Sequence, residues 1–242
     1  MFFLQFHLLK EVGNQYTFYS VEKKKPYVAK KRLRGEDLRF MSTTQKPYHF
    51  LIRRVHSLLG LVPVGLFLTF HIFLNLTALG GADLYDKVIG TMQSFPGIFI
   101  VELVVIFIPI AIHAIYGTWV VYTGQSNVLR YKYARNWFYL IQRISGLYTV
   151  VFIVIHVYLM RVGGEANFAA IAEFVSQPLG LIFYTLGVLF AIFHFVNGLW
   201  AFAITWGITV GPHSQKMWLY TLSAVFILLS VIGLADISAF LK

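Results

Sequence analysis

The chain has 242 residues, of which 58% are hydrophobic and only 12% are charged. A water-soluble domain carries charge on roughly a quarter of its residues, so this composition excludes that class and indicates a membrane protein. The absence of cysteine excludes disulfides, thiolate zinc sites and cysteine-ligated iron–sulfur clusters within the chain, and much of the net charge of +10 lies in the first forty residues.

Residues 1–46 form a basic N-terminal extension that contains the run VEKKKPYVAKKRLR (residues 21–34). It lacks an apolar run followed by a small-residue cleavage site, so it does not resemble a signal peptide. Because Met41 offers a second start, residues 1–40 are interpreted as an upstream extension or a mis-assigned start. The alternative is a disordered basic tail that touches anionic lipid. We expect no part in the chemistry, and no nucleic-acid partner, for this segment.

Five apolar windows in residues 47–242 are long enough to cross a membrane, which takes about 20 helical residues. The expected spans cover residues 50–79, 96–124, 135–162, 178–207 and 215–240. The alternation typical of barrel strands is absent, and Pro96 and Pro178 stand at expected helix starts. The predicted fold is therefore an all-α membrane protein, a bundle of five transmembrane helices.

The distribution of Lys and Arg predicts the orientation of these spans, because cytoplasmic loops are enriched in both residues. The side that holds the N-terminus carries more of them, and we therefore place the N-terminus inside. The residues on that side are Lys46, Arg53, Arg54, Arg130, Lys132, Arg135, Arg143 and Lys216, against Lys87, Arg161 and Lys242 on the other.

Each of the first four spans contains one deeply placed histidine, and the fifth contains none. His71 lies 18 residues after Arg53, about 27 Å along a helix that enters from inside, so we expect it in the outer half. The same argument places His156 in the outer half, and His113 and His194 in the inner half. The sequence thus predicts two pairs at two depths, His71 with His156 and His113 with His194.

Two histidines that face each other at one depth are suited to bind a haem iron from both sides. Such an iron has no open position for O₂ and transfers electrons. Metal binding would also remove the cost of an unsatisfied imidazole in lipid. We therefore expect two haems enclosed by the bundle; a histidine-lined proton-coupled transporter is the main alternative.

Small residues stand where a flat cofactor would need close access to the backbone. The runs HAIYG (residues 113–117) and HFVNG (194–198) place a glycine four residues after a histidine, on the same helix face. Gly60 lies 11 residues before His71 and is expected beside the inner haem, as is Ser145, 11 residues before His156. Ordinary helix packing is the alternative role for the glycines of these runs.

Polar residues at the inner rim are candidates for holding the inner haem's propionates. Ser57 and Gln142 each lie 14 residues before a predicted ligand histidine, on nearly the same face. Basic residues nearby would add positive charge or hydrogen-bond donors, namely His56, Arg53, Arg54 and Arg143. The alternative is that Ser57 and Gln142 are ordinary polar residues at the membrane boundary.

Several long runs resemble one known family in order along residues 47–242. They are RRVHSLLGLVPVGLFLTFH, IFIPIAIHAIYG, NWFYLIQRISG, IHVYLMR and FHFVNGLWAFAITWGITVGPHSQ. The sequence resembles the cytochrome b-type membrane anchors of succinate:menaquinone oxidoreductase, in the class with five helices, two haems and one polypeptide. Quinol:fumarate reductase anchors of that class are similar, and a dihaem anchor of another dehydrogenase is a further alternative.

The resemblance implies a chain in a bacterial-type cytoplasmic membrane that docks a flavoprotein subunit and an iron–sulfur subunit on the cytoplasmic side. Succinate would be oxidised in the flavoprotein. Electrons would pass from the iron–sulfur clusters to an inner haem b, then to an outer haem b and to menaquinone, which is reduced in or beside this chain. The family's ligand motifs fall on His113 and His194 for the inner haem and on His71 and His156 for the outer one.

Two carboxylate positions refine these expectations. Some fumarate reductases of the class carry a Glu two residues before the fourth-helix ligand; that position is Ile192 here, which favours succinate oxidation. Glu102 lies deep in the second span, 11 residues before His113 and about 16 Å closer to the outside. We interpret Glu102 as a candidate for proton exchange at the quinone site, with an inter-helix hydrogen bond as the alternative.

Overall fold

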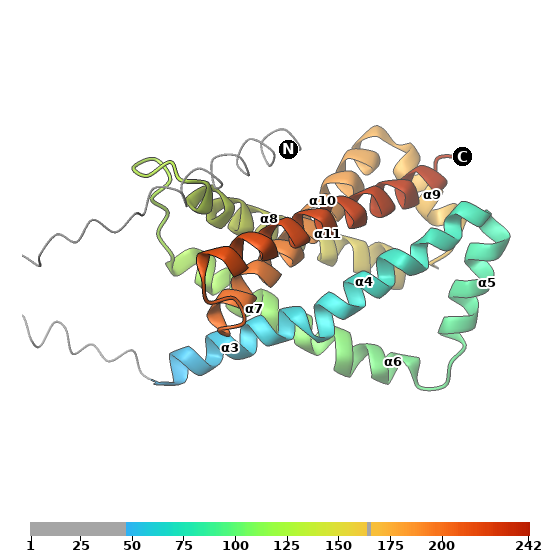
Figure 1. Ribbon diagram of the computed structural model, residues 1–242. Helices are drawn as coiled ribbons and strands as arrows, with labels where there is room; N and C mark the ends of the chain where they lie inside the picture. The colour runs from blue at the N-terminus through green and yellow to red at the C-terminus, as the bar shows by residue number, and fades with distance from the viewer. Residues whose placement is uncertain (1–46, 164–165) are drawn as a thin grey trace, which may run out of the picture. The chain divides into compact units, whose positions relative to one another are not determined.

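The computed structural model describes residues 47–163 and 166–242, so the predicted N-terminal extension over residues 1–46 lies outside the described residues. The chain divides into two units, residues 1–55 and 56–242. All regular structure among the described residues is helical (Figure 1). Five helical segments are long and apolar enough to cross a membrane, which confirms the predicted all-α membrane fold.

The five spans follow the predicted ones within about three residues. The first consists of α3 (Pro47–Leu61), α4 (Pro63–Asn75) and the 3₁₀ helix η1 (Leu76–Gly80). The second consists of α6 (Ile98–Val101), the π-helix η2 (Glu102–Phe107) and α7 (Ile108–Thr123). The third consists of α8 (Ala134–Val157) and the π-helix η3 (Tyr158–Val162). The last two are α10 (Pro178–Thr205) and α11 (Pro212–Ala239).

Proline marks most of the helix starts, because its missing N–H costs least in the first turn. Pro178 and Pro212 begin α10 and α11, and Pro63 begins α4 and so divides the first span. Pro96 differs from the prediction. It lies in the turn before α6, where Gly97 adopts a left-handed φ of 81° and the helix begins only at Ile98.

Two short helices that the sequence analysis did not predict lie in the connections between spans. They are α5 (Ala82–Gln93) and α9 (Phe168–Ser176), and they pack against each other. The Asn167 side chain caps α9 by accepting a hydrogen bond from the Ala170 N–H (2.9 Å), and the Phe168 N–H donates to Asp86 of α5 (2.7 Å). Because α5 and α9 follow the first and third spans, they lie at the same end of the bundle, which we call the α5/α9 end.

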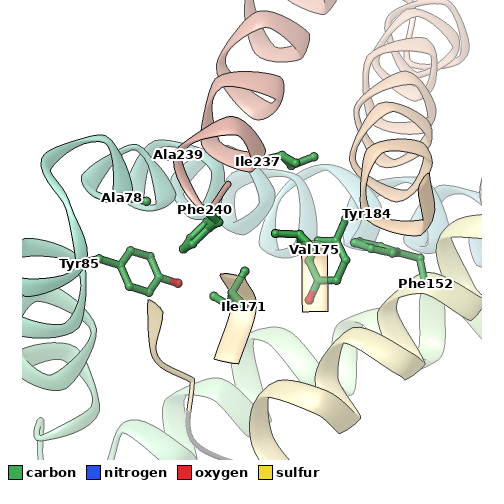
Figure 2. Close-up of a cluster of buried hydrophobic side chains, with 9 residues drawn as sticks. All are labelled: Ala78, Tyr85, Phe152, Ile171, Val175, Tyr184, Ile237, Ala239 and Phe240. Atoms are coloured by element: carbon green, nitrogen blue, oxygen red, sulfur yellow. The ribbon is translucent and has the colours of Figure 1, made fainter. Parts of the chain in front are cut away.

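Within residues 56–242 the long helices pack in a closed ring. Helix α4 contacts α7 and α11, α8 contacts α7 and α10, and α10 contacts α11. One buried hydrophobic cluster lies in the body of the bundle and contains Ile72, Ile192, Phe193, Val196, Leu222, Phe226 and Leu229. A second cluster joins the α5/α9 end to α10 and α11 and is shown in Figure 2.

The helices are unequally packed. In the most apolar window, 39% of α10 and 50% of α11 is buried, against 11%, 6% and 11% in the first three spans. Few residues of the first three spans are therefore buried among the described residues, and these spans carry His71, His113 and His156.

Replacement of Gly187 by alanine tests the tight α8–α10 contact. The added Cβ would lie 2.6 Å from Phe152 Cγ, so the substitution should destabilise the bundle by about 1–3 kcal/mol through overpacking. Thermal unfolding in detergent would measure this. Gly90→Ala on α5 is the control, because its Cβ would meet nothing within 4 Å. Equal stability of the two variants would contradict the prediction.

Candidate functional site

Four histidines from four helices form two pairs. The His71 and His156 rings, from α4 and α8, have centroids 5.8 Å apart and planes at 75°. The His113 and His194 rings, from α7 and α10, have centroids 6.1 Å apart and planes at 85°. The structure therefore brings together the pairs that the depth argument predicts, and each ring is only half-buried in the protein.

Backbone carbonyls orient the rings of His113 and His194, which we call the inner pair after the predicted orientation, with His71 and His156 as the outer pair. His113 Nδ1 lies 3.0 Å from the His56 carbonyl oxygen, and His194 Nδ1 lies 3.1 Å from the Gln142 carbonyl oxygen. A carbonyl oxygen only accepts hydrogen bonds, so each Nδ1 must carry the proton and donate it. Each Nε2 is then unprotonated and available to a metal, which is the usual arrangement of a metal-binding histidine.

The same two rings also lie in close contact with glycines on neighbouring helices. A Cβ on Gly60 of α3 would lie 2.7 Å from His113 Nδ1, and one on Gly146 of α8 would lie 2.8 Å from His194 Cε1. Both distances are shorter than side chains tolerate, so only glycine lets these rings lie flat against the adjacent helix. Gly60 was predicted at this level; on α8 the position belongs to Gly146 rather than to Ser145.

Ser145 has a different contact from the one expected. Its side chain is fully buried, with 0% exposure, and its hydroxyl donates a hydrogen bond to the Gln142 carbonyl oxygen (3.1 Å). Ser145 therefore contacts the carbonyl that also accepts from His194, and so supports that ring indirectly. The two glycines of the His-x-x-x-Gly runs differ: a Cβ on Gly198 would meet only Gln142 Nε2, at 3.7 Å, whereas a Cβ on Gly117 would lie 3.2 Å from His56 Cε1, which is a tight contact.

The outer rings have side-chain neighbours instead of carbonyl partners. His156 Nδ1 lies 3.1 Å from the Tyr184 hydroxyl of α10. Asn75, one turn after His71, donates to the His71 carbonyl oxygen (2.7 Å) and accepts from the Tyr85 hydroxyl of α5 (3.3 Å). Hydrogen bonds thus link both outer histidines to tyrosines in the cluster of Figure 2.

The spacing of both pairs fits a metal held between them. A metal–imidazole bond is about 2 Å long, so two such bonds in line, together with the ring radii, separate two centroids by about 6 Å. The observed values are 5.8 Å and 6.1 Å. A metal with two protein ligands must bring its other ligands with it, as haem iron does.

Buried polar atoms near the pairs support the same fit. His56 Nδ1 and the Tyr116 hydroxyl are buried, and neither has a hydrogen-bond partner among the described residues; the two rings have centroids 5.3 Å apart. The His56 ring stacks on His113, with centroids 4.1 Å apart. Buried polar groups are normally satisfied, so a cluster of orphans indicates a polar partner that belongs there.

The other rim residues are placed as follows. Ser57 accepts a hydrogen bond from the Trp206 indole (3.2 Å). The Gln142 side chain donates to the His194 carbonyl oxygen (3.0 Å) and accepts from Asn197 (2.8 Å). The Arg143 guanidinium donates to the Tyr139 hydroxyl. Their expected contacts to haem propionates stay a prediction, and the Gln142 contacts give this residue an additional role in fixing α8 against α10.

Glu102 lies at the start of η2 and forms an ion pair with Arg161 of η3. The Glu102 side chain is 19% exposed and that of Arg161 is 38% exposed. This contact joins the second and third spans, so the inter-helix role that the sequence left open is observed. Proton exchange by Glu102 stays a prediction.

Three functional candidates were not recognised in the sequence: Gly146, Tyr184 and Asp236. The Gly146 signal was present, because Gly146 precedes His156 by 10 residues much as Gly60 precedes His71 by 11. Tyr184 carried no signal, since its contact with His156 depends on how α8 and α10 cross. Asp236 falls inside the predicted fifth span, residues 215–240, but was given no role there; it is 6% exposed and lies inside α11.

The comparisons with known proteins agree with one another. The family model described as "Succinate dehydrogenase/Fumarate reductase transmembrane subunit" matches residues 125–233. The succinate dehydrogenase cytochrome b558 subunit of Bacillus subtilis is 44% identical over 195 residues, 79% of this chain and 96% of that protein. The succinate dehydrogenase 2 membrane subunit of Mycobacterium tuberculosis is 32% identical over 98 residues, 39% of this chain and 71% of that protein.

Replacement of Glu102 by glutamine separates its two candidate roles. A partly exposed ion pair contributes about 0–1 kcal/mol, so the loss of the charge should change stability by no more than that. Because we expect the structural role to dominate, quinone reduction should stay normal at every pH tested. A steady-state assay of the assembled complex over a pH series, beside thermal unfolding, would measure both. A pH-dependent loss of quinone reduction would instead assign proton exchange to Glu102.

Proposed function

This chain belongs to the family of succinate dehydrogenase/fumarate reductase transmembrane subunits, and on that premise we propose how it works. It is a multi-pass membrane protein and the haem-binding anchor of a complex with flavoprotein and iron–sulfur subunits. We propose that it passes electrons from the iron–sulfur subunit, through two bis-His haems b, to menaquinone. The relatives confirm the resemblance to cytochrome b-type membrane anchors of succinate dehydrogenase.

One observation carries this proposal: two pairs of imidazole rings from four helices, at 5.8 Å and 6.1 Å between centroids. We assign His113 and His194 to one haem and His71 and His156 to the other. Haem iron with two axial histidines accepts and releases single electrons without binding O₂. The protein residues hold the rings in place, set their tautomers and exclude water from the interior.

The two histidine pairs differ in the groups that hydrogen-bond to Nδ1. At the inner pair, the His56 and Gln142 carbonyls fix the Nδ1–H tautomer and so direct Nε2 toward the iron. At the outer pair, Tyr184 is the partner of His156 Nδ1. Hydrogen bonding to an axial histidine changes its basicity and thereby the redox potential of the metal. The two haems are therefore expected to differ in potential.

The docking surface for the iron–sulfur subunit is proposed at the end of the bundle opposite α5 and α9. Two polar or basic segments lie there, residues 125–137 and 209–216, and each consists of a connection and the first turn of the next helix. Arg135 of α8 donates to Gln215 of α11 (3.4 Å), which joins the two segments. Leu129 and Val210 in these loops are 94% and 81% exposed. By the charge asymmetry of the loops, this end and the N-terminus face the cytoplasm.

Succinate oxidation is the proposed physiological direction, with menaquinone as electron acceptor. The residue two positions before His194 is Ile192, which is fully buried at 0% exposure in the central hydrophobic cluster. An apolar side chain at this position offers no carboxylate for proton movement beside the inner pair. Succinate itself reacts in the flavoprotein subunit, and this chain handles electrons and quinone.

Single His→Ala variants test the ligand assignment. Removal of one axial ligand should release one haem and leave the other, so His71→Ala and His156→Ala should lose the same haem. His113→Ala and His194→Ala should both lose the other one. Haem b per chain and reduced-minus-oxidised spectra of the purified complex would measure this. His213→Ala, at an exposed position in the first turn of α11, which carries neither pair, should keep both haems; two haems in any of the four variants would contradict the pairing.

Replacement of Gly60 by alanine tests the close approach of the His113 ring. The new Cβ would displace that ring, so the variant should lose or weaken only the haem held by His113 and His194. The absorbance spectrum and redox titration of the remaining haem would show this selectivity. Gly90→Ala is the control with an open surrounding. An unchanged pair of haems in the Gly60 variant would show that this contact is dispensable.

A further inference from the structure

Asp236 is the least explained charged residue of the described bundle. It lies in the last turns of α11, with 6% of its surface exposed. Its Oδ1 atom is buried and has no hydrogen-bond partner among the described residues, which also provide no ion pair for it. A buried carboxyl group is normally paired or hydrogen-bonded, so the missing partner here indicates a ligand.

The surroundings of Asp236 are the cluster at the α5/α9 end. Its neighbour Ile237 and Phe240, one turn later on α11, both belong to this cluster together with Tyr85 and Tyr184. The Phe240 and Tyr85 rings are 5.2 Å apart. Figure 2 shows the Tyr85 hydroxyl directed into the cluster. The structure thus places two tyrosine hydroxyls and a carboxyl group in one buried region.

Electrostatics supports this proximity. Tyr85 lies on α5, outside the membrane-spanning helices, and burial raises the pKa of its hydroxyl. Nearby negative charge raises that pKa further, and the groups responsible are Tyr184, Asp86 and Asp236. These are the titratable groups that α5, α10 and α11 contribute to the cluster.

Both tyrosines connect this region to the outer histidine pair. The Tyr184 hydroxyl contacts His156 Nδ1 at 3.1 Å. The Tyr85 hydroxyl donates to Asn75, whose amide donates to the carbonyl of His71. The region around Asp236 therefore adjoins the outer pair through one hydrogen-bond link on one side and two on the other.

Asp236 and Glu102 differ in the property that matters for proton exchange. Glu102 forms an ion pair with Arg161. Asp236 has no such partner among the described residues, and it lies about one helical turn, roughly 5 Å, from the end of α11 at Ala239. A carboxyl group with a short path to the surface and no fixed cation can both release and take up protons.

We propose that Asp236 is the carboxyl group that exchanges protons with the quinone, at a headgroup site bordered by Tyr85 and Tyr184 beside the outer histidine pair. This inference rests on the proposed function. Reduction of one quinone to quinol consumes two electrons, which the anchor delivers, and two protons. Asp236 transfers its proton to a quinone carbonyl oxygen, is reprotonated by water from the α5/α9 end, and transfers the second proton in the same way.

The test uses the assembled complex and separates haem reduction from quinone reduction. In Asp236→Asn, succinate should reduce both haems as in the wild type. Reoxidation of the haems by a water-soluble menaquinone analogue, followed by stopped-flow absorbance, should slow by roughly 10²-fold, the lower range for loss of a general acid. Asp236→Glu keeps an acid and should recover most of the rate. Asp83→Asn on the exposed face of α5 is the matched control and should react like the wild type.

Each outcome decides the inference. Wild-type reoxidation in Asp236→Asn with normal haem content would overturn it, as would a rate for Asp236→Glu as low as that for the Asn variant. If the Asn variant does not assemble, Asp236→Ser takes its place with the same two outcomes. Failure of succinate to reduce any haem in the wild-type complex would overturn the proposed function itself, and the inference with it.

Discussion

The structure depends on the cost of an imidazole inside an apolar bundle. An unsatisfied polar ring in this environment is destabilising by a few kcal/mol, and this chain carries four of them in four different helices. Each ring therefore needs partners for both nitrogens. At the His113–His194 pair the backbone supplies the Nδ1 partner of each ring, and the two ring centroids lie 6.1 Å apart, which leaves each Nε2 in need of a partner. A shared metal between them satisfies both at once.

This requirement explains the distribution of small residues and of packing. Gly60 and Gly146 allow the inner rings to lie against neighbouring helices, and any side chain there would push a ring out of line. Helices α10 and α11 have the largest buried fractions of the five spans. The first three spans are mostly exposed on the described part of the chain, and they carry three of the four paired histidines.

The two ends of the bundle divide the proposed functions. The end with the basic loops offers exposed apolar and positively charged residues to partner subunits. The α5/α9 end instead buries tyrosines and Asp236 close to the outer histidines. Electron entry calls for a protein surface, whereas quinone reduction calls for a partly closed site with a proton donor. The short helices α5 and α9 provide that closure.

The sequence by itself determined the number of spans, their approximate bounds and the pairing of the four histidines. These follow from local quantities, namely the length of apolar runs, the positions of Lys and Arg, and the rise per residue of a helix. It also suggested Gly60, because residues 11 positions apart in one helix lie on nearly the same face, and Gly60 stands in that relation to His71. Only the tertiary structure decided that Gly146 rather than Ser145 contacts His194, that Tyr184 contacts His156, and that Asp236 is buried. Those facts depend on the rotation and crossing of helices that are far apart in the chain, and no periodicity within one helix encodes the face that its neighbour presents.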